Sequence, residues 1–163
     1  MKNLIARVWR IIRGPLQWRI LWLGHSKFMA GITGVVRDDQ GRVLLLRHRM
    51  WPEGRQWGLP TGYATAGEEF TATIVREVKE ETGLDVKPGA LVRLKSGYKL
   101  RIEVAYEAVL IGGTLTTDSF EILEARWFTP DSLPNGLQET HRLLILGTDS
   151  PAGHVRSASL PGC

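Results

Sequence analysis

Cysteine is almost absent from this chain of 163 residues, in which Cys163 is the only one. A single cysteine excludes a disulfide within the chain, a metal site built on cysteines and a buried catalytic thiol. Long apolar runs are also missing, because no uninterrupted stretch approaches the ~18 residues that a membrane-spanning helix needs. These absences fit a reducing, cytoplasmic setting, and the length suffices for one ordinary domain.

Acidic residues are absent from the first 37 positions, which hold seven lysines and arginines and therefore carry a charge of +7. The rest of the chain holds 14 lysines and arginines against 17 acidic residues, so the net charge of the whole chain is +4. The basic character belongs to a leader that precedes a mildly acidic domain. We therefore expect no stable nucleic-acid partner, since the high isoelectric point does not describe the whole chain.

The leader, residues 1–27, is predicted to form a basic amphipathic helical arm, with one or two helices over residues 4–23. Gly14 and Pro15 interrupt the pattern, and Pro15 suits the first turn of a second helix. Four interpretations are open: an arm packed on the domain or on the mate in a homodimer, a peripheral helix on a membrane surface, a transit peptide, and a secretory signal. We favour the packed arm, because isolated helices this short are marginal in water.

Strand and helix patterns alternate over residues 28–146 and predict an α/β (α+β) domain. Strands are expected over residues 28–36, 42–49, 57–60 and 125–128, and a pair of strands over residues 91–113. Helices are expected over residues 69–82, with Gly83 as the stop, and after Pro134. The Gly-, Pro- and Ser-rich residues 147–163 are expected to form a flexible tail.

The first predicted helix of the domain gathers three carboxylates on one stripe. Glu80 and Glu81 fall within about 60° and 40° of Glu77 on a helical wheel. Like charges at this spacing repel by some tenths of a kcal/mol per pair, so a positive charge must offset them. A hard divalent cation bound by oxygens is one candidate, and ion pairs with Arg76 and Lys79 on a solvated face are the other.

Residues 62–84 match the Nudix box, Gly-x5-Glu-x7-Arg-Glu-U-x-Glu-Glu-x-Gly-U with U aliphatic, at every specified position. Chance gives such a match with odds below about one in 10⁶ at average residue usage. The chain thus resembles the Nudix hydrolase family, roughly over residues 28–146. The resemblance implies a Nudix fold, a mixed β-sheet sandwiched between α-helices. It also implies a hydrolase that cleaves the pyrophosphate bond of a nucleoside diphosphate linked to another group.

The resemblance assigns the cofactor and its ligands. Glu77, Glu80 and Glu81 are expected to ligate Mg²⁺, with Mn²⁺ as a substitute, and Arg76 is expected to orient a neighbouring glutamate by an ion pair. Glu80 and Arg76 are counted among the catalytic residues. Such an ion would screen the phosphate charge and lower the pKa of a bound water, whose proton a carboxylate accepts.

Other box positions have structural roles by the same resemblance. Glu68 is expected to hydrogen-bond or form an ion pair within the box. Gly62 and Gly83 are expected to supply turns, and Gly62 also a close approach of the backbone. Thr65 departs from the family, because many members carry a glutamate there, and slower or more metal-demanding turnover is the expected consequence.

The catalytic base is open between a glutamate of the box and an acid outside the helix. Glu121 has a placement that resembles the extra metal-binding acid of some relatives, so we count it as catalytic, and Glu124 is the alternative. Glu103 and Glu107 share one face of a predicted strand. That face is directed either to the metal site or to solvent.

Basic and aromatic residues near the box are candidates for substrate binding. Arg47 and Arg49 share a strand face, and Arg55 follows in a loop with Trp51 and Trp57. They are expected to bind phosphate and stack a base of a small nucleotide or nucleotide derivative, unless they are surface charges and core tryptophans. A nucleotide-binding or sensing module with negligible turnover is the alternative function, against which the intact triple glutamate argues.

Overall fold

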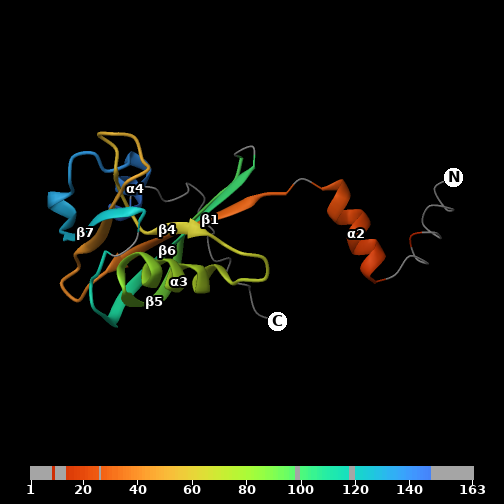
Figure 1. The fold of residues 1–163 in the computed structure, drawn as a ribbon, viewed down its shortest axis with the longest axis horizontal. Coiled ribbons are helices and arrows are strands. Elements are labelled where there is room, and N and C mark those ends of the chain that lie inside the picture. Colours follow the sequence, from red (N-terminus) through yellow and green to blue (C-terminus); the bar gives the residue numbers. More distant parts are fainter. Residues whose placement is uncertain (1–8, 10–13, 26, 98–99, 118–119, 148–163) are drawn as a thin grey trace, which may run out of the picture.

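The computed structural model of the chain describes residues 9, 14–25, 27–97, 100–117 and 120–147. The helical pattern before Gly14 lies outside the described residues except for Trp9, and the predicted tail lies outside them except for Gly147. The described part forms a mixed sheet that carries helix α3 (Phe70–Thr82) on one face and helix α4 (Glu139–Ile145) on the other (Figure 1). A short 3₁₀ helix, η1 (Pro130–Ser132), precedes α4.

The described part contains seven strands: β1 (Met29–Arg37), β2 (Val43–His48), β3 (Trp57–Gly58), β4 (Thr61–Tyr63), β5 (Leu84–Lys95), β6 (Arg101–Gly113) and β7 (Ile122–Phe128). The main order is β3-β2-β1-β6-β5, with β4 paired to β1 and β7 paired to β2. Strands β1 and β6 are parallel over the whole length of β1, from Met29 opposite Arg101 to Arg37 opposite Val109. The other pairs are antiparallel, so the predicted mixed sheet is confirmed.

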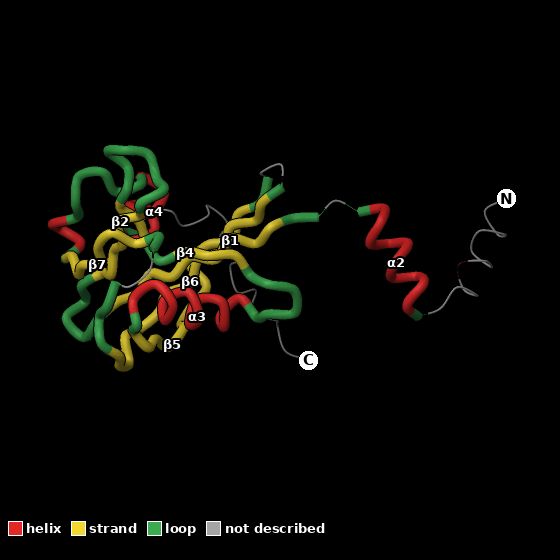
Figure 2. Tube along the Cα trace, in the orientation of Figure 1, coloured by secondary structure: helices red, strands yellow, loops and turns green. Residues whose placement is uncertain are grey.

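The sheet is apolar on both faces because successive side chains of a strand point to opposite sides. Leu44 and Leu46 of β2 pack in the core under α3, whereas Val43 and Leu45 pack in the core under α4. Figure 2 shows strands, in yellow, between these two helices, in red. This double burial explains the continuous apolar run of β2, which a strand with one solvated face would not need.

Strand β5 begins at Leu84, directly after the α3 stop, whereas the sequence predicted a strand only from Leu91. Pro88 lies inside it, next to a register shift between Pro88 and Leu91. Proline cannot donate a ladder hydrogen bond, and it is tolerated here because β5 is the last strand of the main order.

Helix α2 (Pro15–Gly24) stands away from the domain (Figure 1), and Pro15 occupies its first turn as predicted. Trp18 is 75% exposed and Trp22 is 63% exposed. Helix α2 therefore does not cover its own domain, and a second copy of the chain or a membrane surface remains open as its contact. Among the described residues, no helix is long and apolar enough to cross a membrane.

Candidate active site

Helix α3 carries its three glutamates at very different depths. The Glu80 side chain is 60% exposed, the Glu77 side chain is 17% exposed, and Glu81 is buried. The helix ends at Gly83, whose φ of 71° is left-handed and whose N–H donates to the Lys79 carbonyl oxygen at 2.9 Å. Glycine adopts this conformation without strain, so the predicted turn at Gly83 is confirmed.

The Arg76 guanidinium joins the parts of the box into one network. Its Nη1 donates to Glu77 Oε1 at 2.8 Å and to Glu80 Oε2 at 3.2 Å. Its Nε donates to Glu68 Oε1 at 2.9 Å, and its Nη2 donates to the Tyr63 carbonyl oxygen at 3.2 Å. Arg76 thereby fixes two of the three helix glutamates and ties α3 to the loop before it.

Glu68 is the counterpart of Arg76 on that loop. The hydrogen bond from Arg76, and then one from the backbone of Thr65, lowers the pKa of Glu68 to about 2. The Thr65 N–H donates to Glu68 Oε2 at 2.9 Å and the Thr65 hydroxyl at 3.2 Å. At the position where many family members carry a further acid, this chain therefore supplies donors that hold Glu68.

Gly62 lies in β4 opposite Ile32 of β1, directly beneath α3. A Cβ built on Gly62 would overlap the carboxyl group of Glu77. The predicted close approach at Gly62 is therefore confirmed. The predicted turn is wrong, because Gly62 is part of a strand and has no positive φ.

Among the three glutamates of α3, Glu81 has the least access to water. Its Oε2 is buried and has no hydrogen-bond partner among the described residues. Burial, and then the charges of Glu77, Glu121 and Glu80, raise the pKa of Glu81 to about 8. Burial also raises the pKa of Glu77. Acids that raise one another's pKa in this way favour the binding of a proton or a cation.

A cavity of about 500 Å³ opens at these buried acids. Glu77 and Glu81 line it from α3, and Glu121 lines it from the segment that precedes β7. The cavity is also lined by one basic side chain, Arg101, and by the rings of His48, Trp51 and Tyr63. One cavity therefore combines an acidic part with an aromatic and basic part.

The donor chemistry of the acidic part fits a hard divalent cation, because Mg²⁺ and Mn²⁺ prefer oxygen ligands and Glu81 Oε2 is an acceptor without a partner. As the side chains stand, no three carboxylates, imidazoles or thiols within the described ranges form a group that could hold one ion. Glu77 and Glu80 both accept hydrogen bonds from Arg76 Nη1. A cation would compete with this guanidinium for their oxygens.

Glu121 lines the cavity, whereas Glu124, its alternative, does not. The charge of Glu121 contributes to the raised pKa of Glu81. Glu124 lies on β7, where it forms ion pairs with Arg126 and, at 3.2 Å, with Arg47. The geometry therefore favours Glu121 over Glu124 as the further acid of the site.

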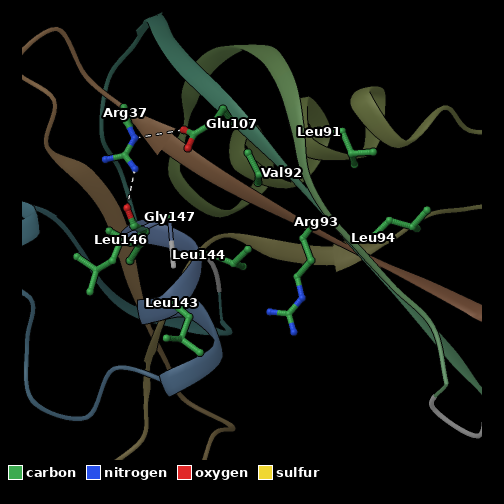
Figure 3. A pocket seen from close by; sticks show the side chains of 11 residues that line it. Arg37, Leu91, Val92, Arg93, Leu94, Glu107, Leu143, Leu144, Leu146 and Gly147 are labelled. Carbon is green, nitrogen blue, oxygen red and sulfur yellow. Dashed lines mark hydrogen bonds and ion pairs between the residues drawn. The ribbon is translucent and has the colours of Figure 1, made fainter. Parts of the chain in front are cut away.

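A larger cavity of about 610 Å³ is lined by β5 and α4 and shares no lining residue with the acidic one (Figure 3). There the Arg37 Nε donates to Glu107 Oε2 at 3.2 Å, and its Nη2 donates to the Ile145 carbonyl oxygen at 2.9 Å. The interpretation that places Glu107 at the metal site is therefore wrong, because Glu107 lines this second cavity.

The three arginines predicted to bind substrate are not among the residues that line the acidic cavity. Arg47 pairs with Glu124, Arg49 donates from Nε to the Phe120 carbonyl oxygen at 2.9 Å, and Arg55 is exposed in the loop before β3. Their role in substrate binding stays a prediction. The basic side chain that does line the cavity is Arg101. No local sequence pattern indicates it, because its place depends on the parallel pairing of β1 with β6.

Comparison with known proteins tests whether the chain belongs to the family that its fold and its box indicate. The NUDIX domain model matches residues 27–146. A MutT-like protein of Streptomyces ambofaciens is 33% identical over 135 residues, which cover 82% of this chain and 83% of that protein. The NAD-capped RNA hydrolase NudC of Mycobacterium tuberculosis is 32% identical over 117 residues, which cover 68% of this chain but only 36% of that protein.

A solved structure, the MutT NUDIX hydrolase from Burkholderia pseudomallei, superposes with a TM-score of 0.65 and 23% identity over 75% of this chain and 98% of its own. That likeness shows the shared fold. The chain belongs to the NUDIX domain family. The enzyme class expected from the box, a Nudix hydrolase that acts on pyrophosphate bonds, is confirmed with it.

Proposed function

We propose that this chain is a Mg²⁺-dependent hydrolase that cleaves the pyrophosphate bond of a nucleoside diphosphate linked to another group, with Mn²⁺ as a substitute metal. The observation that supports this most is the buried Oε2 of Glu81, which has no partner in the described part of the chain. Burial and neighbouring acids raise the pKa of this carboxyl group to about 8, so it is fully ionised at neutral pH only when a cation lies beside it.

Glu77, Glu80 and Glu81 would hold the cation. Arg76 would orient Glu77 and Glu80 through the hydrogen bonds that it donates to both. A divalent cation bound there supplies charge neutralisation for the phosphates and lowers the pKa of the attacking water. The carboxylates then remain ionised ligands at neutral pH, because a nearby positive charge reverses the upward shift of their pKa.

Glu121 is proposed to accept the proton of the attacking water, since it lines the cavity from outside the helix. The water oxygen forms a bond to phosphorus while the bond from that phosphorus to the bridging oxygen breaks. The leaving phosphate departs with the bridging oxygen. Glu80 is the alternative base, and its exposed side chain is open to water.

The chain is proposed to divide into three parts with different roles. We assign residues 28–146 to the Nudix hydrolase domain, residues 1–27 to a basic amphipathic helical arm and residues 147–163 to a flexible tail. The exposed tryptophans of α2 support a contact of residues 4–23 with the second copy of a homodimer or with the surface of an anionic membrane in the cytoplasm. The substrate is a small nucleotide derivative rather than a folded nucleic acid.

A substrate screen tests the proposed function. Nucleotide sugars, ADP-ribose and dinucleotides are incubated with Mg²⁺, with Mn²⁺ or with a chelator, and the nucleotide and phosphate products are separated. We expect cleavage of at least one compound at its pyrophosphate bond, dependent on metal. Binding without turnover of any compound would instead favour the sensing module.

A further inference from the structure

Arg101 is held at the acidic cavity by its surroundings. It begins β6 opposite Met29, and its guanidinium lies over Gly31, where a Cβ would come within 3.2 Å of Nε and 3.4 Å of Nη2. The missing side chain at Gly31 therefore leaves the room that the guanidinium takes. Arg101 Cζ also lies 5.7 Å from the centre of the Tyr63 ring, within the range of a cation–π contact.

The donors of Arg101 are only partly used within the described part of the chain. Its Nη2 lies 3.4 Å from Glu103 Oε1, whereas its Nε is buried and has no hydrogen-bond partner there. A buried N–H without an acceptor is destabilising. A phosphate oxygen is the acceptor that the planar fork of a guanidinium suits best.

Trp51 forms an aromatic boundary of the same cavity, and its orientation is fixed. Its ring stacks on His48, with the ring centres 3.7 Å apart and the planes at 14°. Gly58 lies against its six-membered ring, because a Cβ there would overlap the ring atoms. Burial lowers the pKa of His48 to about 4, so this stack carries no positive charge at neutral pH.

We propose that Arg101 and Trp51 form the recognition side of the cavity, where Arg101 binds a phosphate of the nucleotide and Trp51 stacks on its base. This rests on the proposed function, because it supplies the binding part of a cavity whose acidic part would perform the hydrolysis. His48 covers one face of the indole, so a base would stack on the part of the ring that lines the cavity, and stacking of this kind tolerates different bases. A stacking contact at Trp51 would favour a nucleotide over inorganic pyrophosphate, which has no ring to stack.

Calorimetric titration with ADP, GDP, CDP and UDP in Mg²⁺ tests the two residues separately. For the diphosphate that wild type binds most tightly, Arg101→Gln is expected to weaken binding ~10-fold or more, as a lost charge-assisted contact does. Arg101→Lys should recover part of this affinity, because it restores the charge but not the fork. Trp51→Leu is expected to weaken binding ~10-fold, and Trp51→Phe should recover most of it because stacking survives.

The matched control is Arg126→Gln, which removes the same charge from an exposed ion pair with Glu124 and should bind as wild type does. The melting temperature of each variant is measured alongside. If Arg101→Gln or Trp51→Leu impairs folding, the affinities of Arg101→Lys and Trp51→Phe decide whether these side chains bind the nucleotide. Wild-type affinity in both Arg101→Gln and Trp51→Leu, or no binding of any diphosphate by wild type, would overturn the proposal. Binding through Arg101 without turnover of any substrate would refute the proposed hydrolysis and leave the recognition site standing.

Discussion

Helices α3 and α2 differ in the number and kind of contacts that hold them to the rest of the domain. Helix α3 buries Ile74 and Val78 in the core and ties its charged face to the preceding loop through Arg76. Helix α2 has no side-chain cap at its start and leaves Trp18 exposed. Short helices are marginal without tertiary contacts, so α3 takes its stability from the domain, and we propose that α2 takes its own from a contact outside the domain.

This difference leads us to propose that α3 serves the activity and that α2 serves an association. In α3 the buried face positions the helix and the opposite face presents carboxylates that Arg76 orients. In α2 the exposed tryptophans neither position the helix against the domain nor line its cavity. Changes in α3 and its supports should therefore alter turnover and folding, whereas changes in α2 should alter association alone.

The largest effect is expected for Glu80→Gln, which removes one anionic ligand and keeps the size of the side chain. Turnover should fall ~10²-fold or more, the scale of losing a major charge-stabilising group. Folding should survive, because Arg76 keeps its hydrogen bonds to Glu68 and Glu77. Steady-state kinetics at saturating Mg²⁺ measure this, and Glu139→Gln on the exposed side of α4 is the matched control. Unchanged turnover in Glu80→Gln would remove Glu80 from the ligands.

The next largest effect comes from comparing the same glycine-to-alanine substitution beneath α3 and at the end of α2. In Gly62→Ala the new methyl overlaps the Glu77 carboxyl group, and such overpacking costs about 1–3 kcal/mol. Gly24→Ala at the end of α2 meets no atom within 4 Å and should leave the melting temperature unchanged. Thermal denaturation measures both. Equal stability of the two variants would show that β4 is not pressed against α3.

The smallest effect on the domain is expected from removal of residues 1–26. Stability should change by less than about 0.5 kcal/mol and turnover should stay the same, because α2 stands away from the domain (Figure 1) and its tryptophans are exposed. Light scattering and co-sedimentation with anionic vesicles before and after the deletion identify what the arm binds. A clear fall in melting temperature would instead mean that the arm packs on its own domain.

The parts of the site that lie close together in the sequence were predictable from it. The box placed the glutamates of α3, its stop at Gly83 and the pairing of Arg76 with its neighbours, because each depends on helical spacing over a few residues. The expected helix over residues 69–82 differs from α3 by one residue at its start.

The parts that depend on distant strands were not predictable in this way. Arg101 reaches the cavity because β6 runs parallel to β1, and no local pattern reports that pairing. Gly62 was taken for a turn because its strand is only three residues long and is defined by its pairing with β1. The choice between Glu121 and Glu124 depended likewise on where β7 begins against β2.

We propose above all that the buried carboxylate of Glu81 is a cation ligand. Without metal its pKa is raised from 4.5 to about 8, so the folded state binds this proton more tightly than the unfolded state does. The contribution of Glu81 to stability is therefore lost as the pH rises from about 4.5 to about 8. In Glu81→Gln this loss is absent, because the amide does not ionise.

The most direct measurement is the melting temperature of wild type and Glu81→Gln, in chelator and in Mg²⁺, from pH 5 to pH 8.5. In chelator the variant should melt above wild type at pH 8.5, with a difference that shrinks toward pH 5. Mg²⁺ should raise the melting temperature of wild type and leave that of the variant unchanged. A variant that melts below wild type in chelator and gains as much as wild type from Mg²⁺ would contradict the assignment.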